Sequence, residues 1–101
     1  MAYERIMGLD VIDDQGYKAY RTAMMPILQS FGGAFGFDFR VSEVLLSKTE
    51  DKINRLFTIA FPSQKHMDDF FADPEYLAVK AKYFDVSVNS KTIISTHETN
   101  P

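Results

Sequence analysis

The hydrophobic pattern along this chain alternates between a period of two residues and a period near 3.6, and the order of these segments limits the possible folds. Strand-like runs cover residues 3–11, 34–41, 55–61 and 91–96. Helix-like runs connect the first strand to the second and the third to the fourth. The resulting order, β-α-β-β-α-β with right-handed crossovers, predicts an α+β protein, a ferredoxin-like two-layer sandwich. We expect the first and third strands at the centre of the sheet and the other two at its edges.

The helical patterns have clear start and stop signals. The longest is amphipathic and has these apolar residues at helical spacing: Tyr17, Tyr20, Met24, Ile27, Leu28 and Phe31. Asp13-Asp14 supplies its N-cap, and Gly32-Gly33 ends it. A second helical region begins at Ser63 and starts again after Asp73, where Pro74 takes the tolerated first position of a helix.

The second strand alternates strictly from Ala34 to Val41. We expect one face to carry Phe35, Phe37, Phe39 and Val41, and the other to carry Ala34, Gly36, Asp38 and Arg40. Charged residues suit an edge strand, because they discourage pairing with a further strand.

The apolar content exceeds what one small two-layer core requires. Of 101 residues, 46% are hydrophobic and 14% aromatic, although two helices can cover only one face of a sheet. Three strands nevertheless carry apolar side chains on both faces, at Ile6-Met7, Leu56-Phe57 and Ile93-Ile94. The simplest cover for the second face is another copy of the chain, which predicts a homodimer through the sheet face. The alternative is that some of these residues lie at strand ends and stay uncovered.

Charge and composition exclude several classes of partner. Eleven Lys and Arg against fourteen Asp and Glu give a net charge of −3, which argues against nucleic acid and against an anionic membrane. Without cysteine there is no disulfide framework or thiol nucleophile. The start of the chain lacks the apolar core of a signal peptide, so a cytoplasmic location is expected. We expect one domain over residues 1–101, ordered from about 3 to 97, with a loose tail from Glu98.

Three polar residues are candidates for ligand binding: Asp38, Arg40 and His97. Asp38 and Arg40 are two residues apart on one strand face, where they could orient a polar group of a ligand or pair with each other and protect the edge. His97, at the end of the last strand, could line the mouth of a cavity or face water. His66 shares a helix face with Asp69 but has no further ligands at recognisable spacing, so we expect neither a metal site nor a cofactor.

Short motifs in a fixed order also point to a family. They are Asp13-Asp14 with Tyr17 and Tyr20, Gly32-Gly33, Phe61-Pro62-Ser63 and Asp73-Pro74-Glu75-Tyr76. In these motifs the chain, from about residue 7 to 98, resembles a family of small bacterial proteins, domain of unknown function 1330, in the dimeric α/β-barrel superfamily. The resemblance implies a dimer whose two sheets form a barrel, and it implies no reaction, because the family has no assigned activity.

The chain departs from that family at polar positions. Leu46-Ser47 stands where relatives usually carry Glu-Gly, and no arginine matches the one usual near Tyr83. Arg40 lies close to the position of another arginine common in the family, near Asp38. A polar pocket shared by the family would therefore be rebuilt or lost in this member.

Three functions follow from these observations. The first is a homodimer that binds a small apolar or aromatic molecule, because an aromatic-rich interior with few polar groups is typical of a ligand pocket. The second is a cofactor-independent oxygenase or isomerase acting on a small aromatic or quinone-like substrate. Its acid or base would have to come from Asp10, Asp38, His66, His97 or a tyrosine. The third is a purely structural dimer. The sequence alone assigns no reaction.

Overall fold

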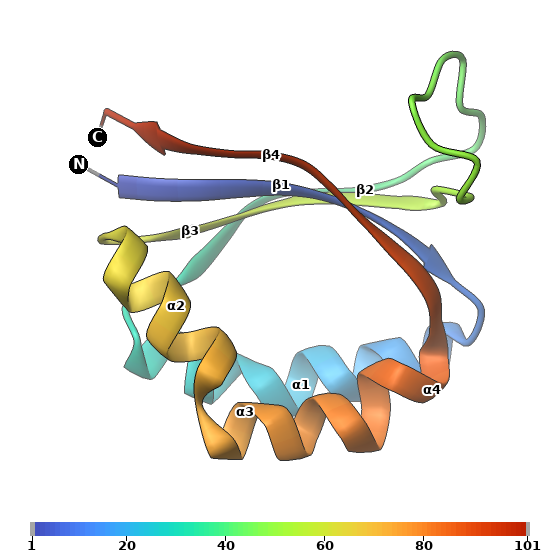
Figure 1. The fold of residues 1–101 in the computed structure, drawn as a ribbon. Helices are drawn as coiled ribbons and strands as arrows, with labels where there is room; N and C mark the ends of the chain where they lie inside the picture. The colour runs from blue at the N-terminus through green and yellow to red at the C-terminus, as the bar shows by residue number, and fades with distance from the viewer. Residues whose placement is uncertain (1, 101) are drawn as a thin grey trace.

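The computed structural model describes residues 2–100 and confirms the expected order of strands. The elements are β1 (Ala2–Val11), α1 (Asp14–Ser30), β2 (Ala34–Arg40), β3 (Arg55–Phe61), α2 (Gln64–Ala72), α3 (Pro74–Val79), η1 (Lys80–Phe84), α4 (Asp85–Ser87) and β4 (Val88–Thr99). The sheet has the order β2-β3-β1-β4 with every neighbouring pair antiparallel, so β1 and β3 are central as predicted. All helices cover the same face of the sheet (Figure 1). This is a ferredoxin-like, two-layer α+β fold.

Both ends of β4 differ from the expected strand of residues 91–96, because β4 already begins at Val88. β4 runs on to Thr99, because Glu98 and Thr99 find partners in Tyr3 and Ala2 of β1. The prediction of a loose tail from Glu98 is therefore wrong up to Thr99, and Pro101 lies outside the described residues. The loop of residues 41–54, which joins β2 to β3, extends beyond the sheet on the side away from the helices (Figure 1).

The expected helix caps are confirmed. The side chains of Asp13, Ser63 and Asp73 each accept a hydrogen bond from a backbone N–H in the first turn of the helix that follows. The last helical region contains a π-helical turn, η1, in which the Asp85 N–H donates to the carbonyl of Lys80. A π-turn holds one more residue than an α-turn, so it changes which side chains face the sheet after Val79.

A bulge in β2 changes which side chains of this strand share a face. Phe35 pairs with Ile59, but the next paired residue is Asp38, opposite Phe57, so β2 has one residue more than β3 over this stretch. Phe35 and Asp38 consequently face the helices, and Phe37 moves to the other face. The expectation that Phe35, Phe37 and Phe39 share one face is wrong.

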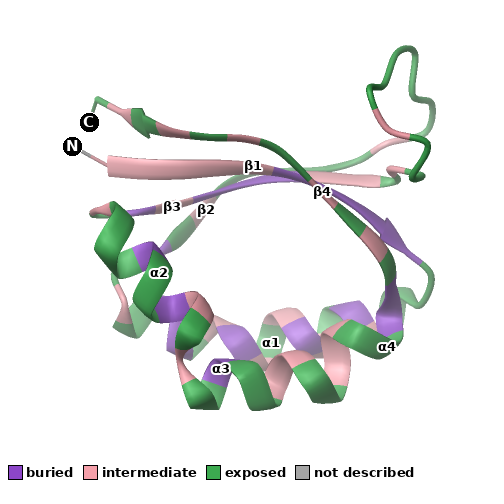
Figure 2. Cartoon of the chain, in the orientation of Figure 1, coloured by how far each residue is buried: buried purple, intermediate pink, exposed green. Residues whose placement is uncertain are grey.

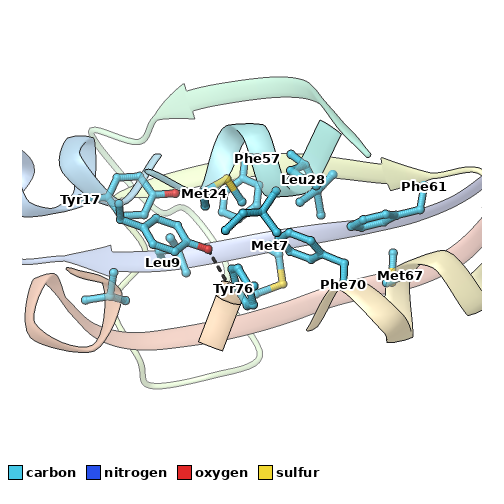
Figure 3. Packing of buried hydrophobic residues seen from close by; sticks show 14 of the residues in the cluster. Met7, Leu9, Tyr17, Met24, Leu28, Phe57, Phe61, Met67, Phe70 and Tyr76 are labelled. Carbon is cyan, nitrogen blue, oxygen red and sulfur yellow. Dashed lines mark hydrogen bonds between the residues drawn. The ribbon is translucent and has the colours of Figure 1, made fainter. Parts of the chain in front are cut away.

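The core lies between the helices and the sheet (Figures 2 and 3). Its most completely buried large apolar side chains are Tyr17, Phe61, Phe70, Leu9, Met24, Leu28 and Met67. Burying a side chain of this size stabilises the fold by about 1.5–3 kcal/mol. No helix within residues 2–100 has the length and apolar character to cross a bilayer.

Candidate functional site

A cavity of about 200 Å³ lies between the helical layer and the sheet. Its wall is rich in aromatic side chains from strands and helices: Tyr17, Tyr20, Phe35, Phe57, Phe71, Tyr76 and Phe84. Leu77 of α3 and Ile93 of β4, each about half exposed, mark its mouth beside the edge strand. The cavity is thus an apolar space that opens between β4 and the last helical region.

Two buried phenols hydrogen-bond to each other on the cavity wall. The hydroxyls of Tyr20 and Tyr76 lie 2.8 Å apart, and the bond is drawn beside Tyr76 in Figure 3. Burial, together with the neighbouring phenol, raises the pKa of Tyr20 far above its usual range, and burial also raises the pKa of Tyr76. At neutral pH both phenols remain protonated, so they can donate hydrogen bonds but do not act as bases.

The charged residues that line the cavity are all cationic. Arg5 of β1, Lys80 of η1 and Lys91 of β4 line it, and none of its described lining residues is a carboxylate or a histidine. Lys80 donates to Asp85 over 2.8 Å, so its charge is already compensated. Arg5 stacks on the ring of Phe71, with 4.8 Å between guanidinium carbon and ring centroid.

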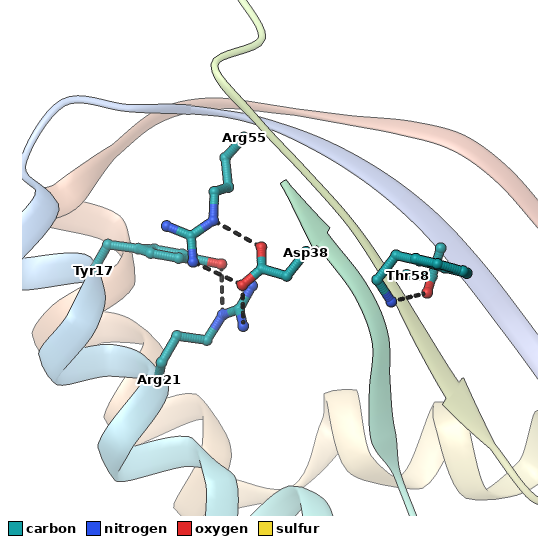
Figure 4. A network of polar contacts seen from close by, with 6 residues as sticks. Tyr17, Arg21, Asp38, Arg55 and Thr58 are labelled. Carbon is teal, nitrogen blue, oxygen red and sulfur yellow. Dashed lines mark hydrogen bonds and ion pairs between the residues drawn. The ribbon is translucent and has the colours of Figure 1, made fainter. Parts of the chain in front are cut away.

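An ionic network supports the cavity wall near β2 (Figure 4). Asp38 accepts two hydrogen bonds of 2.8 Å from Arg55 and one of 3.3 Å from Arg21. Arg21 also donates to the Tyr17 hydroxyl over 2.7 Å and stacks 3.8 Å from the ring centroid of Phe35. The hydrogen bond from Arg55 is the main reason that the pKa of Asp38 is lowered. The network joins α1, β2 and β3 behind two of the aromatic rings that line the cavity.

The structure does not bring the three predicted ligand-binding residues together. Asp38 pairs with Arg21 and Arg55 rather than with Arg40, whose partner is Asp14 at 3.8 Å. His97 faces the opposite side of the sheet and contacts Glu4 at 3.0 Å. Asp38, Arg40 and His97 are not among the residues that line the cavity, and ligand binding by them stays a prediction.

The other polar candidates have structural partners. The buried carboxylate of Asp10 accepts hydrogen bonds from Asn54 at 3.3 Å and Asn89 at 3.2 Å. Asp69 pairs with Lys65 rather than with His66. Across residues 2–100, no three His, Cys, Asp or Glu side chains are grouped so that they could hold a metal ion.

Sequence reasoning missed the cationic lining of the cavity. Arg5 alternates with Met7, Leu9 and Val11, so a charge on the apolar face of a central strand was the available signal. Lys80 gave no such signal, because it faces the cavity from a π-turn that no sequence pattern revealed.

The face of the sheet away from the helices carries several exposed apolar side chains beside the polar pair Glu4 and His97. Phe37 and Phe39 stack on each other there and are 63% and 52% exposed. A wide groove of about 840 Å³ runs between this face and the loop of residues 41–54, whose Leu45 and Leu46 are almost fully exposed. We refer to the sheet face and this loop together as the open face. Among the described residues, its apolar side chains Phe37, Phe39, Leu45 and Leu46 stay largely exposed (Figure 2).

Comparison with known proteins agrees with this fold. The chain shares its fold with a protein of unknown function from Rhodopseudomonas palustris, at 15% identity and a TM-score of 0.81, over 99% of this chain and 84% of that one. It is also similar to a ferredoxin-like dabb family protein from Mesorhizobium loti, at 13% identity and a TM-score of 0.67, over 99% and 98% of the two chains. A dimeric protein of unknown function with a ferredoxin-like fold from Bacteroides fragilis has 13% identity and a TM-score of 0.62, over 97% and 96%.

These similarities define the class as ferredoxin-like α+β proteins. Residues 2–96 match the family model of the domain of unknown function DUF1330, so the chain belongs to that family. No curated protein matches the sequence. No reaction is assigned by the family or by these structural neighbours.

Proposed function

We propose that this protein is a homodimer that binds a small apolar or aromatic molecule in the cavity between its helices and its sheet. The cavity itself carries the proposal, because seven aromatic side chains surround a space of about 200 Å³ with an opening at the edge strand. An apolar protein cavity of about 150 Å³ is large enough to hold benzene. The volume therefore fits a single aromatic ring with a short substituent.

The open face supports the dimer. An exposed apolar patch of this extent is unusual on a monomer and typical of an interface. The loop of residues 41–54 projects from one side of the sheet (Figure 1), and the groove between the loop and the sheet leaves room for side chains of a second copy. The structural neighbour from Bacteroides fragilis is described as dimeric. A second copy of the chain would cover Phe37 and Phe39.

The polar groups of the cavity favour binding over acid–base catalysis. A cofactor-independent oxygenase or isomerase would need a proton acceptor beside its substrate. Of the candidates Asp10, Asp38, His66, His97 and tyrosine, only tyrosines line the cavity. Burial raises the pKa of Tyr17, Tyr20 and Tyr76 alike, so all three stay protonated at neutral pH. The cavity's opening beside Ile93 favours ligand binding over a purely structural dimer, which needs no access to its interior.

Calorimetric titration with a neutral single-ring compound, benzyl alcohol, tests the binding proposal. We expect saturable binding to the wild type and at least tenfold weaker binding to Ile93→Trp, because the larger side chain obstructs the mouth. Val86→Trp is the matched control, since Val86 is 65% exposed on α4 and does not line the cavity. Absence of binding to the wild type, or equal binding to Ile93→Trp, would contradict the proposal.

A further inference from the structure

Arg5, a cation on the cavity wall without an ion-pair partner among residues 2–100, indicates which kind of small molecule would bind there. Among the described residues, Arg5 has neither an ion-pair partner nor a hydrogen-bond acceptor for its buried Nε. A buried donor without an acceptor costs free energy, and the cost is larger for a charged group. Arg5 is therefore suited to donate a hydrogen bond to an acceptor group on a bound molecule.

The surroundings of Arg5 do not supply that acceptor. Glu4, the adjacent carboxylate, faces the other side of the sheet, where it contacts His97. Glu98 shares the face of Arg5 but lies opposite Tyr3, and within residues 2–100 it forms no ion pair. Asp85 is occupied by Lys80. Arg5 and Lys91, which form no ion pair among residues 2–100, thus leave uncompensated positive charge beside an apolar space.

We propose that the ligand is a small aromatic acid whose carboxylate pairs with Arg5 while its ring occupies the apolar cavity. A guanidinium can donate two parallel hydrogen bonds to a carboxylate, a geometry that an ammonium does not provide. Stacking on Phe71 limits the rotation of the Arg5 guanidinium and so orients it before binding. This inference rests on the proposed binding function and adds the chemical class of the ligand.

Benzoate and benzyl alcohol test the inference, because they are similar in size and differ in charge. For the wild type we expect benzoate to bind about tenfold more tightly than benzyl alcohol at low salt, as one charge-assisted contact can provide. Arg5→Met keeps much of the apolar stem, so it should remove this preference and leave the affinity for benzyl alcohol within about twofold. Arg5→Lys keeps the charge but not the two parallel donors, so it should keep only part of the preference for benzoate.

The control is Arg40→Met, which removes an exposed arginine that does not line the cavity. It should leave the preference for benzoate unchanged. Equal affinities of the wild type for the two compounds would overturn the inference while leaving the binding function intact. Loss of the preference in Arg40→Met but not in Arg5→Met would overturn it as well. If neither compound binds the wild type, the proposed function itself fails.

Discussion

Gly36 lies directly against the side chain of Thr58. A Cβ atom on Gly36 would come within 2.6 Å of the Thr58 hydroxyl oxygen, which accepts a 2.8 Å hydrogen bond from the N–H of Phe37. The pair occurs where β2 has its extra residue, so the close approach and the hydrogen bond both belong to the bulge. The bulge in turn directs Asp38 toward α1 and Phe37 toward the open face.

Gly36→Ala should therefore destabilise the protein. We expect a loss of about 1–3 kcal/mol in the free energy of unfolding, measured by urea denaturation, since Cβ must displace the Thr58 hydroxyl or the strand. In a Thr58→Ala background the obstructing oxygen is absent, and the same substitution should cost less. Equal costs in the two backgrounds would show that this contact does not shape the bulge.

The Tyr20–Tyr76 pair should respond asymmetrically to the loss of hydroxyl groups. Tyr20→Phe leaves the buried Tyr76 hydroxyl without its partner, and we expect it to cost about 1–2 kcal/mol of unfolding free energy. The double variant Tyr20→Phe/Tyr76→Phe removes both polar groups and should be no less stable than the single variant. If the double variant loses as much unfolding free energy as the sum of the losses in the two single variants, this account is contradicted.

Asp38 should make stability depend on pH in the acid range. Its pKa is lower in the folded protein than the usual unfolded value near 4, so the stabilisation is complete above that value and is lost as pH falls through the folded pKa. Asp38→Asn should be less stable than the wild type at pH 7 by about 1 kcal/mol, because Asp38 is partly exposed. The difference should shrink below pH 4 in chemical denaturation curves. A constant difference from pH 7 to pH 3 would contradict the assignment.

The open face should control the oligomeric state. Phe39→Glu places a charge on the proposed interface, and we expect the variant to be a monomer at micromolar concentration in sedimentation velocity. Val86→Glu, an exposed apolar position on α4 outside the open face, should remain dimeric. A wild type that sediments as a monomer would exclude the dimer. A dimeric Phe39→Glu variant would show that the dimer interface lies elsewhere.

The fold could be predicted because its main signals are local. Alternating strands, the cap residues Asp13 and Ser63 and the order of elements all depend on residues close in the chain. The altered faces of β2 could not be predicted, because the bulge depends on a contact with Thr58, which is remote in the sequence. The cationic lining of the cavity was missed in part for a similar reason, since the π-turn that presents Lys80 follows no simple hydrophobic period.

The candidate ligand residues show the same division. Asp38 and Arg40 share a face as expected, but their partners come from α1 and β3, so sequence spacing alone did not predict that Asp38 binds two arginines. Arg5 carried a usable signal as the one charge in an apolar series, and the structure shows that it lines the cavity.

The most direct test of ligand binding in this cavity is NMR of the protein with ¹³C-labelled methionine methyl groups, titrated with benzyl alcohol. Met7 and Met24 line the cavity, whereas Met67 is fully buried in the core outside it. We predict saturable shifts of the Met7 and Met24 methyl signals, with nuclear Overhauser contacts to the ligand ring, and an unchanged Met67 signal. If the Met7 and Met24 signals stay unchanged at saturating ligand, the cavity does not bind it.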